Sequence, residues 1–101
     1  MRWLAMSQIT DNPGRNRLEM SFPAPSGGQR LVFADYIRRN GSMIIPHVEA
    51  DPELRGSGAA GAFMAALAEY ARVEGLKLIP TCGYAVAWFR RHPDAGDVLA
   101  G

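Results

Sequence analysis

The fold is decided by residues 55–75, which read RGSGAAGAFMAALAEYARVEG. A glycine-rich turn leads here into residues 59–74, which are rich in alanine and contain no proline, so a long helix is predicted. Phe63 and Leu67 recur at helical spacing on one face of that helix. Gly75 follows at the position where a left-handed residue commonly ends a helix. We therefore expect a helix that begins directly after a glycine turn.

Strands are predicted before and after this helix in the chain, from the alternation of apolar and polar side chains and from short apolar runs. They cover residues 17–22, 31–37, 43–48 and 76–79. Asn40-Gly41 favours a tight hairpin between the second and third strands. Pro46 interrupts the third strand and predicts a bulge or an unpaired edge near His47. A second helix over residues 84–91 completes an α/β (α+β) fold with a mixed, mostly antiparallel sheet and one crossover helix.

Length and composition limit what the chain can be. With 101 residues it fits one domain over residues 1–101, whose core we expect at about residues 17–94. Residues 1–10 are expected to extend from this core, and residues 1–5 are an upstream extension if Met6, rather than Met1, is the true start. The formal charge of +1 gives no field that would draw the chain onto nucleic acid or an anionic membrane.

Cysteine usage and hydropathy suggest where the protein works. Cys82 is the only cysteine, so no intramolecular disulfide can form and a reducing cytoplasm is the default expectation. No segment approaches the roughly 20 apolar residues that a membrane span needs. We therefore expect a cytoplasmic protein that binds neither nucleic acid nor a membrane.

The glycine turn has the chemistry of a phosphate site. A helix start presents unpaired backbone N–H groups and the positive end of the helix dipole, and Gly56 and Gly58 keep side chains away from that point. The alternative is that these glycines only make a tight turn. Residues 56–61 formally match the dinucleotide pattern G-x-G-x-x-G, but residues 51–55 separate the first glycine from its strand. A Walker-type loop is excluded because no Gly-Lys-Ser or Gly-Lys-Thr occurs.

A more specific match lies in Arg55-Gly56-Ser57-Gly58-Ala59-Ala60, which fits the R-x-x-G-x-G/A signature with which GNAT acetyltransferases hold the pyrophosphate of coenzyme A. The chain resembles the short, stand-alone GNAT-like family from about Leu18 to Asp94. His47 before the turn, Pro80-Thr81-Cys82 and Arg91-His92-Pro93-Asp94 carry that likeness. The resemblance implies acetyl-CoA as cofactor and two strands that splay apart to admit the thioester. Pro46 and Pro80 would weaken pairing between those strands.

The resemblance also implies a set of site residues. Those expected to contact the cofactor are Val48, Glu49, Ala50, Arg55, Gly56, Ser57, Gly58, Ala59, Ala60, Cys82, Tyr84, Trp88 and Arg91. The basic end of the last helix, which includes Arg91, either reaches the adenosine 3′-phosphate or only complements the helix dipole. Trp88 stands where the family has a tyrosine, and it has no hydroxyl to act as an acid.

His47, Glu49 and Cys82 are the candidate catalytic residues. His47 and Glu49 are two apart on one strand, so both point to the same face and can together take a proton from an amine. Cys82 follows the strand on the other side of the gap, where a thiolate can accept the acetyl group covalently. The alternative roles are structural: a half-buried histidine with a polar partner, and a small core cysteine.

Two functions of different classes follow. The first is an enzyme that transfers an acetyl group from acetyl-CoA to an unidentified small-molecule or protein amine. The second is a non-catalytic acyl-CoA sensor or partner-binding subunit, because 101 residues leave little wall to enclose an acceptor. An RNA-binding α/β module is disfavoured by the near-neutral charge.

Overall fold

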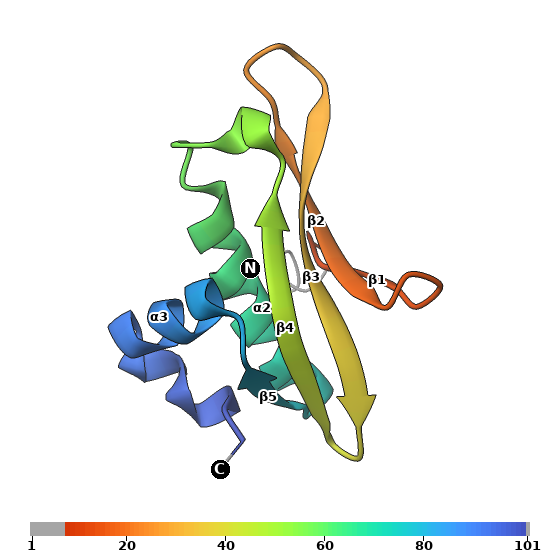
Figure 1. The fold of residues 1–101 in the computed structure, drawn as a ribbon, viewed down its shortest axis with the longest axis vertical. Helices are drawn as coiled ribbons and strands as arrows, with labels where there is room; N and C mark the ends of the chain where they lie inside the picture. The colour runs from red at the N-terminus through yellow and green to blue at the C-terminus, as the bar shows by residue number, and fades with distance from the viewer. Residues whose placement is uncertain (1–7, 101) are drawn as a thin grey trace.

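The computed structural model describes residues 8–100, which form a sheet with helices on one side (Figure 1). Met1 and Met6, the alternative starts, lie outside these residues. The elements in chain order are β1 (Thr10–Asn12), β2 (Arg17–Pro23), β3 (Gln29–Arg39), β4 (Ser42–Ala50), the 3-10 turn η1 (Pro52–Leu54), α2 (Ala59–Glu74), β5 (Lys77–Pro80), α3 (Gly83–Arg91) and the 3-10 segment η2 (Pro93–Val98).

The sheet has five strands in the order β1-β2-β3-β4-β5. Neighbours are antiparallel except β4 and β5, which run parallel because α2 crosses over between them. The mixed, mostly antiparallel sheet expected from the sequence is confirmed, and so is its crossover helix. Strand β1 was not predicted, since Thr10, Asp11 and Asn12 are all polar and show no alternation.

A bulge in β4 sets which side chains face the open side of the sheet. Asp35 pairs with His47 and Ile37 pairs with Ile44, so Ile45 and Pro46 lie opposite Tyr36 alone. The bulge expected from Pro46 is confirmed. It shifts the alternation of β4 by one residue.

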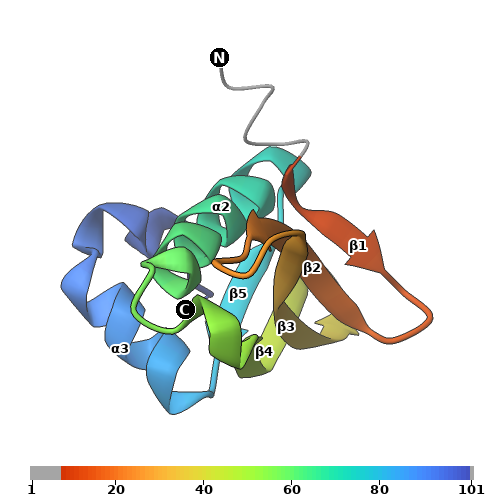
Figure 2. The ribbon, with the colours of Figure 1, turned by 90° about the horizontal axis from the view of Figure 1, so that it is seen from above.

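The core fills the space between the sheet and α2. Met43 and Ile45 are buried with Phe63 and Leu67 of α2, whereas His47 after the bulge is exposed. α3 adds buried side chains to the same cluster, namely Ala85, Trp88 and Phe89. Figure 2 shows α2 against one face of the sheet and α3 beside the edge that β5 forms.

The opposite face of the sheet carries no helix among residues 8–100 (Figures 1 and 2). Leu31 and Ile37 of β3 point to that side and are 37% and 51% exposed. We call it the open face. None of the described helices is both long enough and apolar enough to span a bilayer.

Candidate functional site

The turn before α2 is built by left-handed glycines. Asp51 caps η1 by accepting a hydrogen bond from the Glu53 N–H at 2.9 Å, and the chain then enters the turn. Gly56 and Gly58 have φ values of 79° and 82°, which other residues adopt only with strain. A Cβ at either position would meet no atom within 4 Å. The glycines are therefore needed for backbone conformation, and the space beside them is open.

Ser57 stabilises the turn from inside. Its hydroxyl donates to the Leu54 carbonyl oxygen at 2.6 Å and accepts from the Ala59 N–H at 3.2 Å. Its own N–H donates to the same Leu54 oxygen at 3.1 Å. The Ser57 side chain is thus occupied by the turn.

The start of α2 leaves backbone donors free. Gly58 occupies the N-cap position and offers no side chain to cap the helix. Within residues 8–100 the N–H groups of Gly56, Gly58, Ala60 and Gly61 donate no hydrogen bond. Unpaired donors at a helix start, reinforced by the helix dipole, bind anions.

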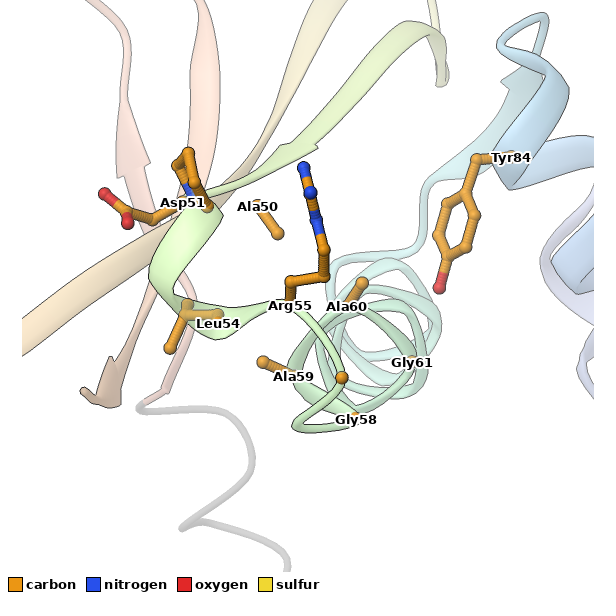
Figure 3. Close-up of a pocket in the computed structure, with 11 residues that line it drawn as sticks. Ala50, Asp51, Leu54, Arg55, Gly58, Ala59, Ala60, Gly61 and Tyr84 are labelled. Carbon is orange, nitrogen blue, oxygen red and sulfur yellow. The ribbon is translucent and has the colours of Figure 1, made fainter. Parts of the chain in front are cut away.

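These donors border a cavity of about 340 Å³. It lies between the end of β4, the turn, the first residues of α2 and the start of α3. Figure 3 shows the Arg55 side chain extending between Ala50 and Tyr84, with Ala60 and Gly61 below it. Arg55 makes no ion pair with any residue of the described part of the chain. The cavity therefore combines a free cation with free backbone donors.

β4 and β5 separate beside this cavity. Their pairing runs from Ser42 and Lys77 to Ile45 and Pro80. The N–H groups of Thr81 and Cys82 then both converge on the Ile45 oxygen, at 3.0 and 3.3 Å. Beyond Ile45, no strand in residues 8–100 pairs with the β5 side of β4, so residues 48–50 present an open backbone edge. The splay expected from the sequence is confirmed.

His47 and Glu49 lie together on the open face. The His47 Nε2 is 2.9 Å from the Glu49 Oε1, and the two side chains are 51% and 56% exposed. The His47 ring centroid lies 6.3 Å from that of Phe33 on β3. The shared face predicted for this pair is confirmed, and their catalytic role stays a prediction.

Cys82 lies at the N-cap of α3, half-buried against the core. Its N–H bond to Ile45 holds the start of α3 beside the β4 bulge, two residues before His47 in the chain. The structure thus brings Cys82 to the point where β4 and β5 begin to separate. α3 begins there, so the dipole of its first turn points toward Cys82.

The cavity gathers some of the predicted cofactor residues and not others. Those that line it are Ala50, Arg55, Gly56, Gly58, Ala59, Ala60 and Tyr84. Val48, Glu49, Ser57, Cys82, Trp88 and Arg91 do not line it. Trp88 is only 5% exposed and stacks on His92 with ring centroids 4.0 Å apart, whereas Arg91 is exposed on α3.

Four lining residues were missed by sequence reasoning: Asp51, Pro52, Leu54 and Gly61. Gly61 had a signal, because it is the last glycine of the G-x-G-x-x-G match and lies inside a helix, where glycine has no conformational reason to be. A Cβ there would meet no atom within 4 Å. The sequence also contained a signal for Asp51-Pro52, since this pair of residues commonly starts a helical turn.

Comparison with known proteins places this geometry in a family. The chain superposes on the solution NMR structure of a GCN5-like candidate N-acetyltransferase from Staphylococcus aureus with a TM-score of 0.65 and 24% identity, over 92% of this chain and 87% of that chain. That likeness supports the fold. A comparison with curated proteins found no match. The family model for GCN5-related N-acetyl-transferases matches residues 20–98, and the protein is therefore a member of that family.

Proposed function

We propose that the protein transfers an acetyl group from acetyl-CoA to an amine. The observation that carries the proposal is the helix start at Gly58, which has free N–H groups and no side-chain cap, beside the unpaired Arg55 and the open edge of β4. Family membership supports acyl transfer in general. The nature of the acyl donor and of the acceptor is our proposal.

The residues around the cavity fit coenzyme A. The pyrophosphate needs hydrogen-bond donors and positive charge, which the N–H groups of Gly56, Gly58 and Ala60 and the Arg55 guanidinium can supply. The amide-rich pantetheine arm needs a strand edge, which residues 48–50 offer. Tyr84 would form the opposite wall, and the exposed Arg91 at the far end of the same helix would contact the 3′-phosphate.

In this mechanism His47 takes the proton of the attacking amine. Acetyl-CoA supplies an acetyl thioester. The amine nitrogen forms a bond to the thioester carbon, the carbon–sulfur bond breaks, and the CoA sulfur leaves with the electron pair. The Glu49 Oε1, 2.9 Å from the His47 Nε2, holds the ring in one orientation.

Cys82 offers a second route, in which its thiolate first accepts the acetyl group and the amine then removes it. Because Trp88 has no hydroxyl, the departing sulfur must leave as a thiolate or take its proton from Cys82 or water. A CoA thiol has a pKa of about 8.5, so it is a good leaving group without an acid. Direct transfer is therefore the simpler of the two routes.

The test is a calorimetric titration with acetyl-CoA, followed by turnover of labelled acetyl-CoA with a mixed panel of amines. Binding that is weakened in Arg55→Ala and unchanged in Arg39→Ala, an exposed hairpin arginine, supports the cavity. Binding with turnover supports the enzyme. Binding without turnover assigns the protein to the acyl-CoA sensors, and absence of binding contradicts the proposal.

A further inference from the structure

A second cavity opens on the other side of the Asp51-Pro52 segment. It has a volume of about 330 Å³ and shares these two residues with the cavity described above. Its remaining walls come from β2, β3 and β4, and they include Arg17, Phe33 and Glu49. Glu49 is the hydrogen-bond partner of His47. This cavity therefore lies next to the proposed proton acceptor.

Arg17 lies on the open face, but its side chain is largely covered by its neighbours. Its guanidinium carbon lies 3.9 Å above the Phe33 ring, and its side chain is only 20% exposed. It forms an ion pair with Glu19, but the Glu19 Oε2 is 3.7 Å from the Arg17 Nε, which is beyond hydrogen-bonding distance. The buried Nε has no hydrogen-bond partner in the described part of the chain. A desolvated guanidinium with unused donors is costly unless an anion completes it.

The other arginine of this cavity, Arg30, makes a shorter ion pair than Arg17 does. The Arg30 Nε lies 3.0 Å from the Glu53 Oε1. That contact helps to hold the pKa of Glu53 below its ordinary value, after the larger effect of the hydrogen bond from Ser26. Arg17 is therefore the arginine of this cavity whose Nε–H donates no hydrogen bond within residues 8–100.

Register places Arg17 and the His47 pair at opposite ends of one short row. Arg17 pairs with Asp35, and Asp35 pairs with His47, so the three side chains share the open face on neighbouring strands. Directly paired residues lie about 5 Å apart, which puts the ends of the row about 10 Å apart at Cβ. The long Arg17 side chain leans over Phe33 and shortens that gap. Asp35 adds a negative charge between them.

We propose that this cavity is the acceptor subsite and that the acceptor is a small amine carrying a carboxylate. The amine lies toward His47 and Glu49, and the carboxylate completes the Arg17 guanidinium in a bidentate pair. The inference rests on the proposed function. The ammonium first gives one proton to water, the free amine then bonds to the acetyl carbon, and its second proton passes to His47 as the CoA thiolate leaves.

The test compares acceptors that differ only in the carboxylate: γ-aminobutyrate against butylamine, and β-alanine against propylamine. We expect kcat/KM to be at least about tenfold higher for each amino acid than for its matched amine, since the free energy of hydrogen bonds to charged groups corresponds to a factor of at least about ten. In Arg17→Gln the difference should vanish, while Arg17→Lys should restore part of it. Arg39→Gln, at the exposed end of β3, is the matched control.

Calorimetry with CoA separates failure of this inference from failure of the proposed function. If CoA does not bind, the proposed function is wrong. If CoA binds and the paired acceptors react equally well in the parent and in Arg17→Gln, the acceptor subsite is wrong.

If CoA binds without turnover, titration of the CoA-loaded protein with γ-aminobutyrate decides. A shift of the Arg17 Nε–H resonance and of the Phe33 and Glu49 amides supports the subsite, and unchanged spectra overturn it. Thermal unfolding of each variant checks that the fold is retained.

Discussion

At the scale of single residues, His47 carries the proposed proton transfer. Its side chain is half exposed and bonded to Glu49, so replacing it removes little packing. We expect His47→Ala to lower kcat by about a hundredfold or more, the range of general-base catalysis, with little change in CoA affinity. Steady-state kinetics and calorimetry measure the two effects. Turnover equal to that of the parent would assign His47 to structure alone.

Cys82 distinguishes the two routes of transfer. A covalent route predicts that the protein, mixed with acetyl-CoA and no amine, gains one acetyl group that is lost in Cys82→Ser. Intact-protein mass spectrometry makes this measurement. Direct transfer instead predicts no adduct and near-parental turnover in Cys82→Ser. Because Cys82 is half-buried against the core, the serine variant needs a thermal-unfolding control.

At the scale of elements, the first turn of α2 begins the helix and also carries the free N–H groups of the proposed pyrophosphate site. Gly61 is helical and uncrowded, so Gly61→Ala should stabilise α2 by up to about 1 kcal/mol. The added methyl group lies at the wall of the cofactor cavity and should weaken CoA binding. The free energy of unfolding, measured with denaturant, should therefore rise, while the CoA affinity, measured by calorimetry, should fall. Tighter or equal CoA binding in this variant would contradict the proposal that CoA binds in this cavity.

Gly58→Val tests the same turn less cleanly. The bulky side chain should block close approach of a phosphate. The φ value of 82° means that valine is strained there, so some stability is lost as well. Unchanged CoA affinity in Gly58→Val would still show that the turn does not bind the pyrophosphate.

At the scale of the whole molecule, an ion pair joins α2 to the C-terminal segment. The Arg72 Nε and Nη2 donate to the two Asp97 carboxylate oxygens at 2.7 and 2.8 Å. These bonds lower the pKa of Asp97 and raise that of Arg72. A lowered carboxyl pKa stabilises the fold above the unfolded pKa, and this contribution is lost as pH falls through the folded value.

Asp97→Asn should therefore lower Tm slightly at neutral pH, and the difference from the parent should narrow progressively below pH about 4. Thermal unfolding over a pH series measures it. The pair is exposed, so added salt should also reduce the difference. A Tm difference independent of both pH and salt would show that the pair does not join these elements energetically.

Short-range features of this protein could be predicted from the sequence. The helix over residues 59–74, its left-handed ends at Gly58 and Gly75, the hairpin at Asn40-Gly41 and the bulge at Pro46 all depend on neighbouring residues and their backbone preferences. His47 and Glu49 share a face because they are two residues apart on β4, and the bulge before them decides that this is the open face. The family signature in residues 55–60 then located the turn that borders the proposed cofactor cavity.

Contacts between distant segments were decided only by the tertiary structure. The polar strand β1 forms because β2 offers it an edge, and Tyr36 of β3 holds it by donating a hydrogen bond to Asp11 at 2.7 Å. Tyr84 lines the same cavity as Arg55 because α3 and the turn before α2 lie at the same end of β4, and Arg17 lies over Phe33 because β2 pairs with β3. Local periodicity states which face a side chain takes. It does not state which distant side chain it meets there, since that depends on how the whole chain packs.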